Sequence, residues 1–230
     1  MSCEPRYGVI AGDIVGSTEL STELRRRLPE ILESSYRALR SAYRDQLPYE
    51  LAIAAGDEWR IAVDDPHVAL AVSLAFATRL KARDITSRVV VAIDTIDFIE
   101  DGDLHRSDGA ALRRAGRGLK KLERGDRNFD LVVPSTSSEP CALSAASIAD
   151  LVDLLLDDLT AAQSRAVASM LCGVDDGTYP TATSIAEDWT PEPISRQAVG
   201  KHLSRARWPR IKDTLDRFQQ LMELLGRHDT

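Results

Sequence analysis

Two apolar runs that each break at an aspartate constrain this chain more than any other feature. The first, Gly8–Thr18, has the pattern of a buried strand that ends at Asp13 and leads through a glycine-bearing loop into a helix. The second, Leu51–Val63, has the pattern of a hairpin with Asp57 at its turn. Mg²⁺ takes one or two carboxylates and completes its coordination with phosphate and water. The pattern therefore predicts Mg²⁺ or Mn²⁺ ligands at Asp13 and Asp57, although Gly-Asp is also ordinary turn chemistry.

The loop that follows the first strand has the composition of a phosphate cradle. Backbone N–H groups at the start of a helix point outward and favour an anion. The candidate phosphate-binding residues are Ile14, Val15, Gly16, Ser17 and Thr18.

A third segment, Arg106–Leu122, has the pattern of a helix that starts at Ser107 or Asp108. An apolar stripe runs along its inner side, made of Leu112, Ala115, Leu119 and Leu122. Its other faces are basic. A solvated surface would explain them, but so dense a positive face repels itself unless an anion binds to it.

Together the three segments resemble the catalytic domain of class III nucleotidyl cyclases. The resemblance implies that Asp13 and Asp57 hold two metal ions and that Arg117, with Arg113, neutralises charge in the transition state. It also implies a head-to-tail homodimer, because the arginine would come from a second protomer. Two positions depart from the cyclase pattern: Ile53 stands where a base-reading lysine is expected, and Arg113 where an asparagine is expected.

The chain resembles the SatD family of small bacterial proteins more closely. The shared features are the Gly-Asp-Ile near the start, the Gly-Asp-Glu-aromatic hairpin, the Asp-Gly-x-Ala helix start at Asp108 and a helix-turn-helix tail. This resemblance adds Asp108 to the predicted nucleotide-binding residues. Gly116 takes the place of the family's arginine, which comes one residue later at Arg117.

Two functions follow from these motifs. One is a metal-dependent cyclase that converts a nucleoside triphosphate to a cyclic nucleotide and pyrophosphate. The other is a catalytically inactive domain that senses a nucleotide and regulates transcription through the tail. The absent lysine favours the second, whereas the two aspartates favour at least metal–phosphate binding.

The element order of the first part is β-α-β-β-α-β-α-β, which predicts an α+β, ferredoxin-like sandwich with helices on one face of the sheet. The expected strands are Tyr7–Ile14, Tyr49–Ala55, Glu58–Val63, Ser87–Asp94 and Phe129–Val133, and the expected helices are Leu20–Asp45, Pro66–Arg83 and Gly109–Arg124. The expected domains are a cyclase-like unit over 1–133, a linker over 134–147 and a small all-α unit over 148–230.

The last part of the chain has the pattern of a helix-turn-helix. After helices at Ile148–Leu159 and Thr160–Leu171, a short helix at Thr183–Trp189 precedes a second at Ser195–Arg205. The candidate DNA contacts are Ser195, Arg196, Gln197, Lys201 and Arg205. A helical module that docks another protein is the alternative.

Overall composition selects no function. The 230 residues carry a formal net charge of −7, which excludes a protein that coats nucleic acid with its whole surface. Cys3, Cys141 and Cys172 lack metal-type spacing and predict free thiols in a reducing cytoplasm. No apolar stretch approaches the roughly 20 residues that a membrane span needs. We therefore expect a soluble, cytoplasmic protein.

Overall fold

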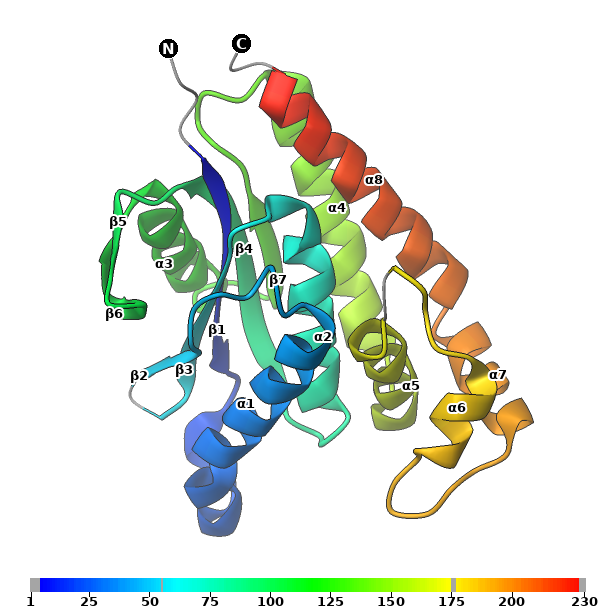
Figure 1. Cartoon of the computed structure of the whole chain (residues 1–230). Helices are drawn as coiled ribbons and strands as arrows, with labels where there is room; N and C mark the ends of the chain where they lie inside the picture. The colour runs from blue at the N-terminus through cyan, green and yellow to red at the C-terminus, as the bar shows by residue number, and fades with distance from the viewer. Residues whose placement is uncertain (1–4, 55, 175–176, 228–230) are drawn as a thin grey trace.

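The computed structural model describes residues 5–54, 56–174 and 177–227, and within them the chain is a mixed α+β protein (Figure 1). A five-stranded sheet has the order β2-β3-β1-β4-β7, and a separate two-stranded sheet pairs β5 with β6. The strands are β1 (Arg6–Ile14), β2 (Ala52–Ala54), β3 (Glu58–Val63), β4 (Ser87–Thr95), β5 (Phe98–Glu100), β6 (Asp103–Asp108) and β7 (Phe129–Val132). Cys3 and Ala55 lie outside the described residues.

Strand β1 is at the centre of the large sheet. It pairs antiparallel with β3 on one edge and with β4 on the other, and β4 pairs parallel with β7. Because side chains alternate along a strand, Ile10 and Ile14 face one side of the sheet while Val9 and Ala11 face the other. All four are buried, so both faces of β1 are covered.

Helices cover the two faces of the sheet unequally (Figure 1). Helices α1 (Thr22–Ala42) and α2 (Ala69–Lys81) pack on the face that carries Ile10, each after a short 3-10 turn, η1 (Ser17–Glu19) and η2 (Pro66–Val68). Helix α3 (Ala110–Leu122) packs on the opposite face. The prediction of helices on one face only is therefore wrong, because α3 connects β4 to its parallel neighbour β7 by crossing over the second face.

The predicted inner stripe of α3 is confirmed, but the predicted start of the helix is not. Leu112, Ala115, Leu119 and Leu122 are all buried. Ser107 and Asp108 belong to strand β6, and Gly109 is the N-cap. A Cβ at Gly109 would lie 2.5 Å from the Cα of Ile96, so the close approach of backbone to backbone requires glycine here.

Five further helices follow β7, listed with their bounds: α4 (Glu139–Asp158), α5 (Ala161–Cys172), α6 (Ala182–Glu187), α7 (Arg196–Arg205) and α8 (Trp208–Arg227). Within the segment 134–147, which the sequence predicts as a linker, the residues from Glu139 onward are helical. Phe129 of β7 and Val152 of α4 belong to one buried cluster that also includes Phe218 of α8. The Tyr43 hydroxyl donates to the Leu171 carbonyl at 3.0 Å, which ties the end of α1 to α5.

Sequence patterns missed the β5–β6 hairpin and helix α8. The hairpin is short and rich in charge, with only Leu104 of β6 buried, so it has no strong apolar alternation.

The thiol of Cys141 is buried, that of Cys172 is half-buried, and both are free. In the described part of the chain, no helix combines the length and the apolar character needed to cross a membrane.

Two glycines of α3 test its packing on the sheet. A Cβ at Gly118 would lie 2.8 Å from a methyl carbon of Val90, whereas a Cβ at Gly116 would meet nothing within 4 Å. We expect Gly118→Ala to lower the free energy of unfolding by about 1–3 kcal/mol through overpacking. Gly116→Ala should raise it by about 0.5–1 kcal/mol because alanine is the better helix former. Urea denaturation measures both, and equal effects would show that α3 does not rest on Val90.

Candidate functional site

Asp13 lies near the end of β1, where an arginine from the neighbouring strand neutralises it. The Arg88 Nη1 atom lies 3.0 Å from Asp13 Oδ2, and the two side chains are 21% and 14% exposed. Strand register puts them together, since Asp13 pairs directly with Arg88 across β1 and β4. Arg88 was not among the predicted site residues. It directly precedes the apolar run Val89–Ile93 of β4.

The second carboxylate oxygen of Asp13 has no partner. Oδ1 is buried without a hydrogen bond. Burial raises the pKa of the Asp13 carboxyl, Arg88 opposes that rise, and the negative charges of Glu123 and Asp57 add to it. The end of β1 is therefore a site where one more positive group or hydrogen-bond donor would be stabilised.

The structure brings Ser17 and Asp57 together beside this strand end. The Ser17 hydroxyl donates to Asp57 Oδ2 at 2.6 Å, across 40 residues of sequence. Asp57 lies in the turn between β2 and β3, as predicted. Asp13, Ser17 and Asp57 thus form the part of the predicted site that the fold assembles.

Only part of the predicted phosphate loop faces outward. Ile14 is buried in the core, and the Val15 amide donates to the Thr86 carbonyl at 2.9 Å. Gly16 adopts a left-handed conformation with φ of 63°, which glycine tolerates at little cost. Gly16 and Thr18 are exposed and Ser17 is half-buried, so these three remain as the accessible part of the loop.

Metal ligands are sparse. Within residues 5–54, 56–174 and 177–227, no three His, Cys, Asp or Glu side chains come together as a metal-binding group. The oxygen donors near Asp13 include its own Oδ1 and the carboxylates of Asp57 and Glu123. This set suits one ion that arrives with phosphate ligands, but it does not suit two resident ions, because Arg88 already occupies Oδ2.

Two of the predicted residues, Asp108 of β6 and Arg113 of α3, lie away from Asp13. Arg113 forms ion pairs with Asp108 at 2.7 Å and with Asp97 at 3.3 Å. Asp97 follows the end of β4 that pairs with Arg6, at the start of β1. Asp13 follows Arg6 by seven residues in the extended strand β1, so the two lie ~23 Å apart at about 3.3 Å per residue. Asp108 and Arg113 therefore do not share a site with Asp13 within one chain.

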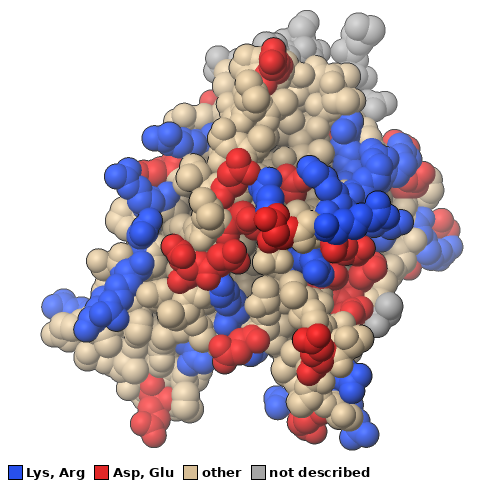
Figure 2. All heavy atoms as spheres, turned by 180° about the vertical axis from the view of Figure 1, so that it is seen from behind, with Lys and Arg blue, Asp and Glu red and all other residues tan. Residues whose placement is uncertain are grey.

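Arg117 is exposed in the middle of α3, on the basic face that the sequence predicted. Figure 2 shows Lys and Arg side chains gathered over this part of the surface, next to a band of acidic side chains. Several cations of the face are paired, including Arg114 with Asp94 at 2.5 Å and Lys121 with Asp130 at 3.7 Å. Carboxylates of the same chain thus balance part of the charge.

In the tail, α6 and α7 pack against each other and leave the predicted DNA contacts exposed. Val199 of α7 is fully buried against Ile185 and Ala186 of α6. Ser195 caps α7, since its side chain accepts from the Ala198 amide at 3.1 Å. The exposed residues include all five predicted contacts: Ser195, Arg196, Gln197, Lys201 and Arg205.

The segment between these helices is held by aromatic contacts. Trp189 stacks on His202 with ring centroids 5.7 Å apart, and the Arg165 guanidinium lies 5.4 Å from the Trp189 ring. Trp208 meets Tyr179 edge to face. Both tryptophans are therefore packing anchors of the tail, and His202 is engaged in this packing.

Comparisons with known proteins give weak structural likenesses. No family model and no curated protein sequence matches the chain. An adenylate cyclase from Trypanosoma brucei in its monomeric state has a TM-score of 0.39 at 14% identity, covering 55% of this chain and 73% of that one. A bacterial light-regulated adenylyl cyclase has 0.39 at 10% identity, covering 55% and 74%. The active GGEEF domain of a diguanylate cyclase from Vibrio cholerae has 0.38 at 17% identity, covering 57% and 85%. TM-scores this low do not decide a function.

Removal of Arg88 should shift the titration of Asp13. Burial already raises the pKa of this carboxyl and Arg88 counteracts it, so Arg88→Gln should raise the pKa further. A carboxyl whose pKa is higher in the folded than in the unfolded state destabilises the fold once the pH exceeds the unfolded-state pKa, which is about 4 for aspartate. The variant should therefore lose stability relative to wild type as the pH rises from about 4. Carboxyl ¹³C chemical shifts measure the pKa. An unchanged or lower midpoint would show that the ion pair does not form in solution.

Proposed function

We propose that the protein binds a nucleotide at the end of β1 without converting it, and that it binds DNA through α7. The observation that carries this proposal is the ion pair between Arg88 and Asp13, in which a guanidinium holds an oxygen that two-metal chemistry would need. The protein is then a nucleotide-responsive regulator. The residues of 1–133 would take up the signal and those of 148–230 would deliver it.

The nucleotide site consists of the Gly16–Thr18 loop, Asp57 and the free Oδ1 of Asp13. The Ser17 hydroxyl has a single proton, which it donates to Asp57. Once a phosphate-bound ion takes up the Asp57 carboxylate, that proton would be available to a phosphate oxygen. Mg²⁺ or Mn²⁺ bound to the phosphates would be held by Asp57 and Asp13, and it would supply neutralising charge. Arg88 would remain on Asp13 and limit the site to one such ion.

A cyclase remains the second candidate, and one observation favours it. Arg117 is exposed in the middle of α3, where the Asp13 site of another copy of the chain could receive it. That arrangement is the head-to-tail homodimer that the class III resemblance implies. Ile53 and Arg113, which replace the expected lysine and asparagine, count against turnover.

Helix α7 supports DNA binding by its exposed basic and amide side chains. Its apolar residue Val199 faces α6, which leaves Gln197, Lys201 and Arg205 four residues apart on one outward stripe. This is the geometry in which a second helix enters the major groove. We further propose that the tail is a helix-turn-helix and that the chain is a cytoplasmic member of the SatD family.

The first test incubates purified protein with each nucleoside triphosphate and Mn²⁺, followed by chromatography. We expect the triphosphate to be bound and recovered intact. Asp57→Ala should reduce binding at least tenfold because the phosphate-bound ion loses its main protein ligand, whereas Arg26→Ala, at an exposed site on α1, should not. Recovery of a cyclic nucleotide and pyrophosphate would establish the cyclase instead, and undiminished binding in Asp57→Ala would remove the site.

The second test titrates duplex DNA against variants of α7. Arg196→Ala or Gln197→Ala should lower affinity for a preferred sequence by roughly 1–3 kcal/mol, because base contacts specify sequence. Lys201→Ala should weaken all sequences and reduce the salt slope by about one unit if it contacts phosphate. Arg217→Ala, an exposed change on α8, is the matched control. Absence of salt-sensitive binding by the full chain would favour a protein-docking tail.

A further inference from the structure

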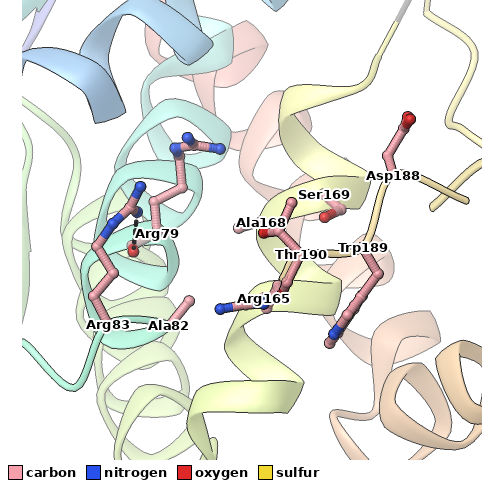
Figure 3. Close-up of a pocket in the computed structure, with 9 residues that line it drawn as sticks. All are labelled: Arg79, Ala82, Arg83, Arg165, Ala168, Ser169, Asp188, Trp189 and Thr190. Atoms are coloured by element: carbon pink, nitrogen blue, oxygen red, sulfur yellow. Dashed lines mark hydrogen bonds between the residues drawn. The ribbon is translucent and has the colours of Figure 1, made fainter. Parts of the chain in front are cut away.

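A cavity of about 330 Å³ lies between α2, α5 and the segment that follows α6. Figure 3 shows three arginines at this cavity: Arg79 from α2, Arg83 from the turn that follows α2, and Arg165 from α5. Trp189 and Thr190 form the opposite wall. The cavity is separate from the strand-end site, and no sequence motif pointed to it.

The three guanidinium groups lack carboxylate partners. Among the described residues, none of them forms an ion pair with an Asp or Glu side chain, whereas Arg88 and Arg113 do. Asp188 also lines the cavity, but Figure 3 shows its carboxylate turned away from the arginines. The positive charge at this cavity is therefore not balanced by the chain that forms it.

Neutral groups take only part of the hydrogen-bonding capacity of these arginines. Arg83 Nη1 donates to the Arg79 carbonyl at 3.1 Å, and Arg165 Nη1 donates to the Thr190 carbonyl. Among the described residues Arg79 Nε is buried without a hydrogen-bond partner, while the Arg79 side chain also interacts with the Cys172 thiol. Burial, followed by the positive charges of Arg79 and Arg165, lowers the pKa of the Arg83 guanidinium. Each arginine thus keeps donors free while the three charges repel one another.

We propose that this cavity binds a phosphate-bearing small molecule. Guanidinium groups donate in a fixed fork that matches phosphate oxygens, and a cluster of them holds a polyanion more strongly than isolated pairs do. The volume suits a ligand larger than a single ion. Arg79 is only half exposed at the inner wall, so the site suits a ligand that enters the cavity rather than the backbone of a DNA duplex.

The position of the cavity gives such a ligand a route to α7. Arg165 contacts both the Thr190 carbonyl and the Trp189 ring, and Trp189 stacks on His202 of α7. A phosphate that draws Arg165 toward Arg83 would change those contacts. The ligand would therefore bridge α2, which packs on the sheet, and the segment that leads into α7.

The test is calorimetric titration of the full chain with inorganic pyrophosphate in EDTA, which prevents metal-dependent binding at the strand end. We expect binding that weakens at least tenfold in Arg83→Gln, which loses only a hydrogen bond to the Arg79 carbonyl, and in Arg165→Gln. Arg26→Gln, an exposed arginine on α1, is the matched control and should bind as wild type does. Thermal unfolding confirms that each variant is folded.

Three outcomes would overturn the proposal. The first is no binding of pyrophosphate to wild type, or equal binding in wild type and a folded Arg83→Gln. The second is loss of binding in Ser17→Ala in place of Arg83→Gln, which would put pyrophosphate at the strand-end loop. The third is binding of citrate in preference to pyrophosphate, which would make the cavity a carboxylate site. This titration contains no free metal ion. Its result therefore does not depend on whether a nucleotide binds at Asp57, and the two proposals are tested separately.

Discussion

The pairing of β1 with β3 and β4 at once is the constraint on which the rest of the structure depends. A strand that is paired on both edges and covered on both faces has no freedom to slip, because a shift of one residue would reverse every side chain. Gly12 tightens this register further: a Cβ there would lie 2.3 Å from the Trp59 ring and 2.5 Å from the Arg88 carbonyl oxygen. The same register sets Arg88 directly across from Asp13.

Charge compensation distinguishes several arginines near the sheet from those at the cavity beside α5. Those near the sheet, Arg88 on Asp13, Arg114 on Asp94 and Arg113 on Asp97 and Asp108, are matched by carboxylates of the same chain. Among the described residues, Arg83 and Arg165 at the cavity beside α5 donate to backbone carbonyls and form no ion pair with a carboxylate. A carboxylate that is paired with a guanidinium is already neutralised and binds a metal ion less strongly, whereas guanidinium groups without a carboxylate partner favour binding of an external anion. This contrast is why the strand end is assigned to binding rather than turnover, and why the cavity is assigned a ligand.

Local patterns predicted much of the fold but not the surroundings of its charges. The hairpin over Leu51–Val63 with its turn at Asp57 and the helices that begin beside Thr160 and Ser195 follow from local signals, and the structure contains each of them. The choice of sheet face for α3 depends on the parallel pairing of β7 with β4, which no local pattern encodes. The Arg88 ion pair and the arginine cavity likewise depend on residues far apart in sequence, so they could only be found in three dimensions.

The central claim is that Arg88, rather than a resident metal ion, neutralises Asp13. Electron paramagnetic resonance of free Mn²⁺ tests it directly, because the six-line spectrum of the aqueous ion weakens when protein binds it. Without nucleotide, we expect wild type to leave the spectrum unchanged at equimolar Mn²⁺. Arg88→Gln should weaken the spectrum, and the double variant Arg88→Gln, Asp13→Asn should restore it. If wild type binds Mn²⁺ as strongly as Arg88→Gln does, Arg88 does not keep a metal ion off Asp13.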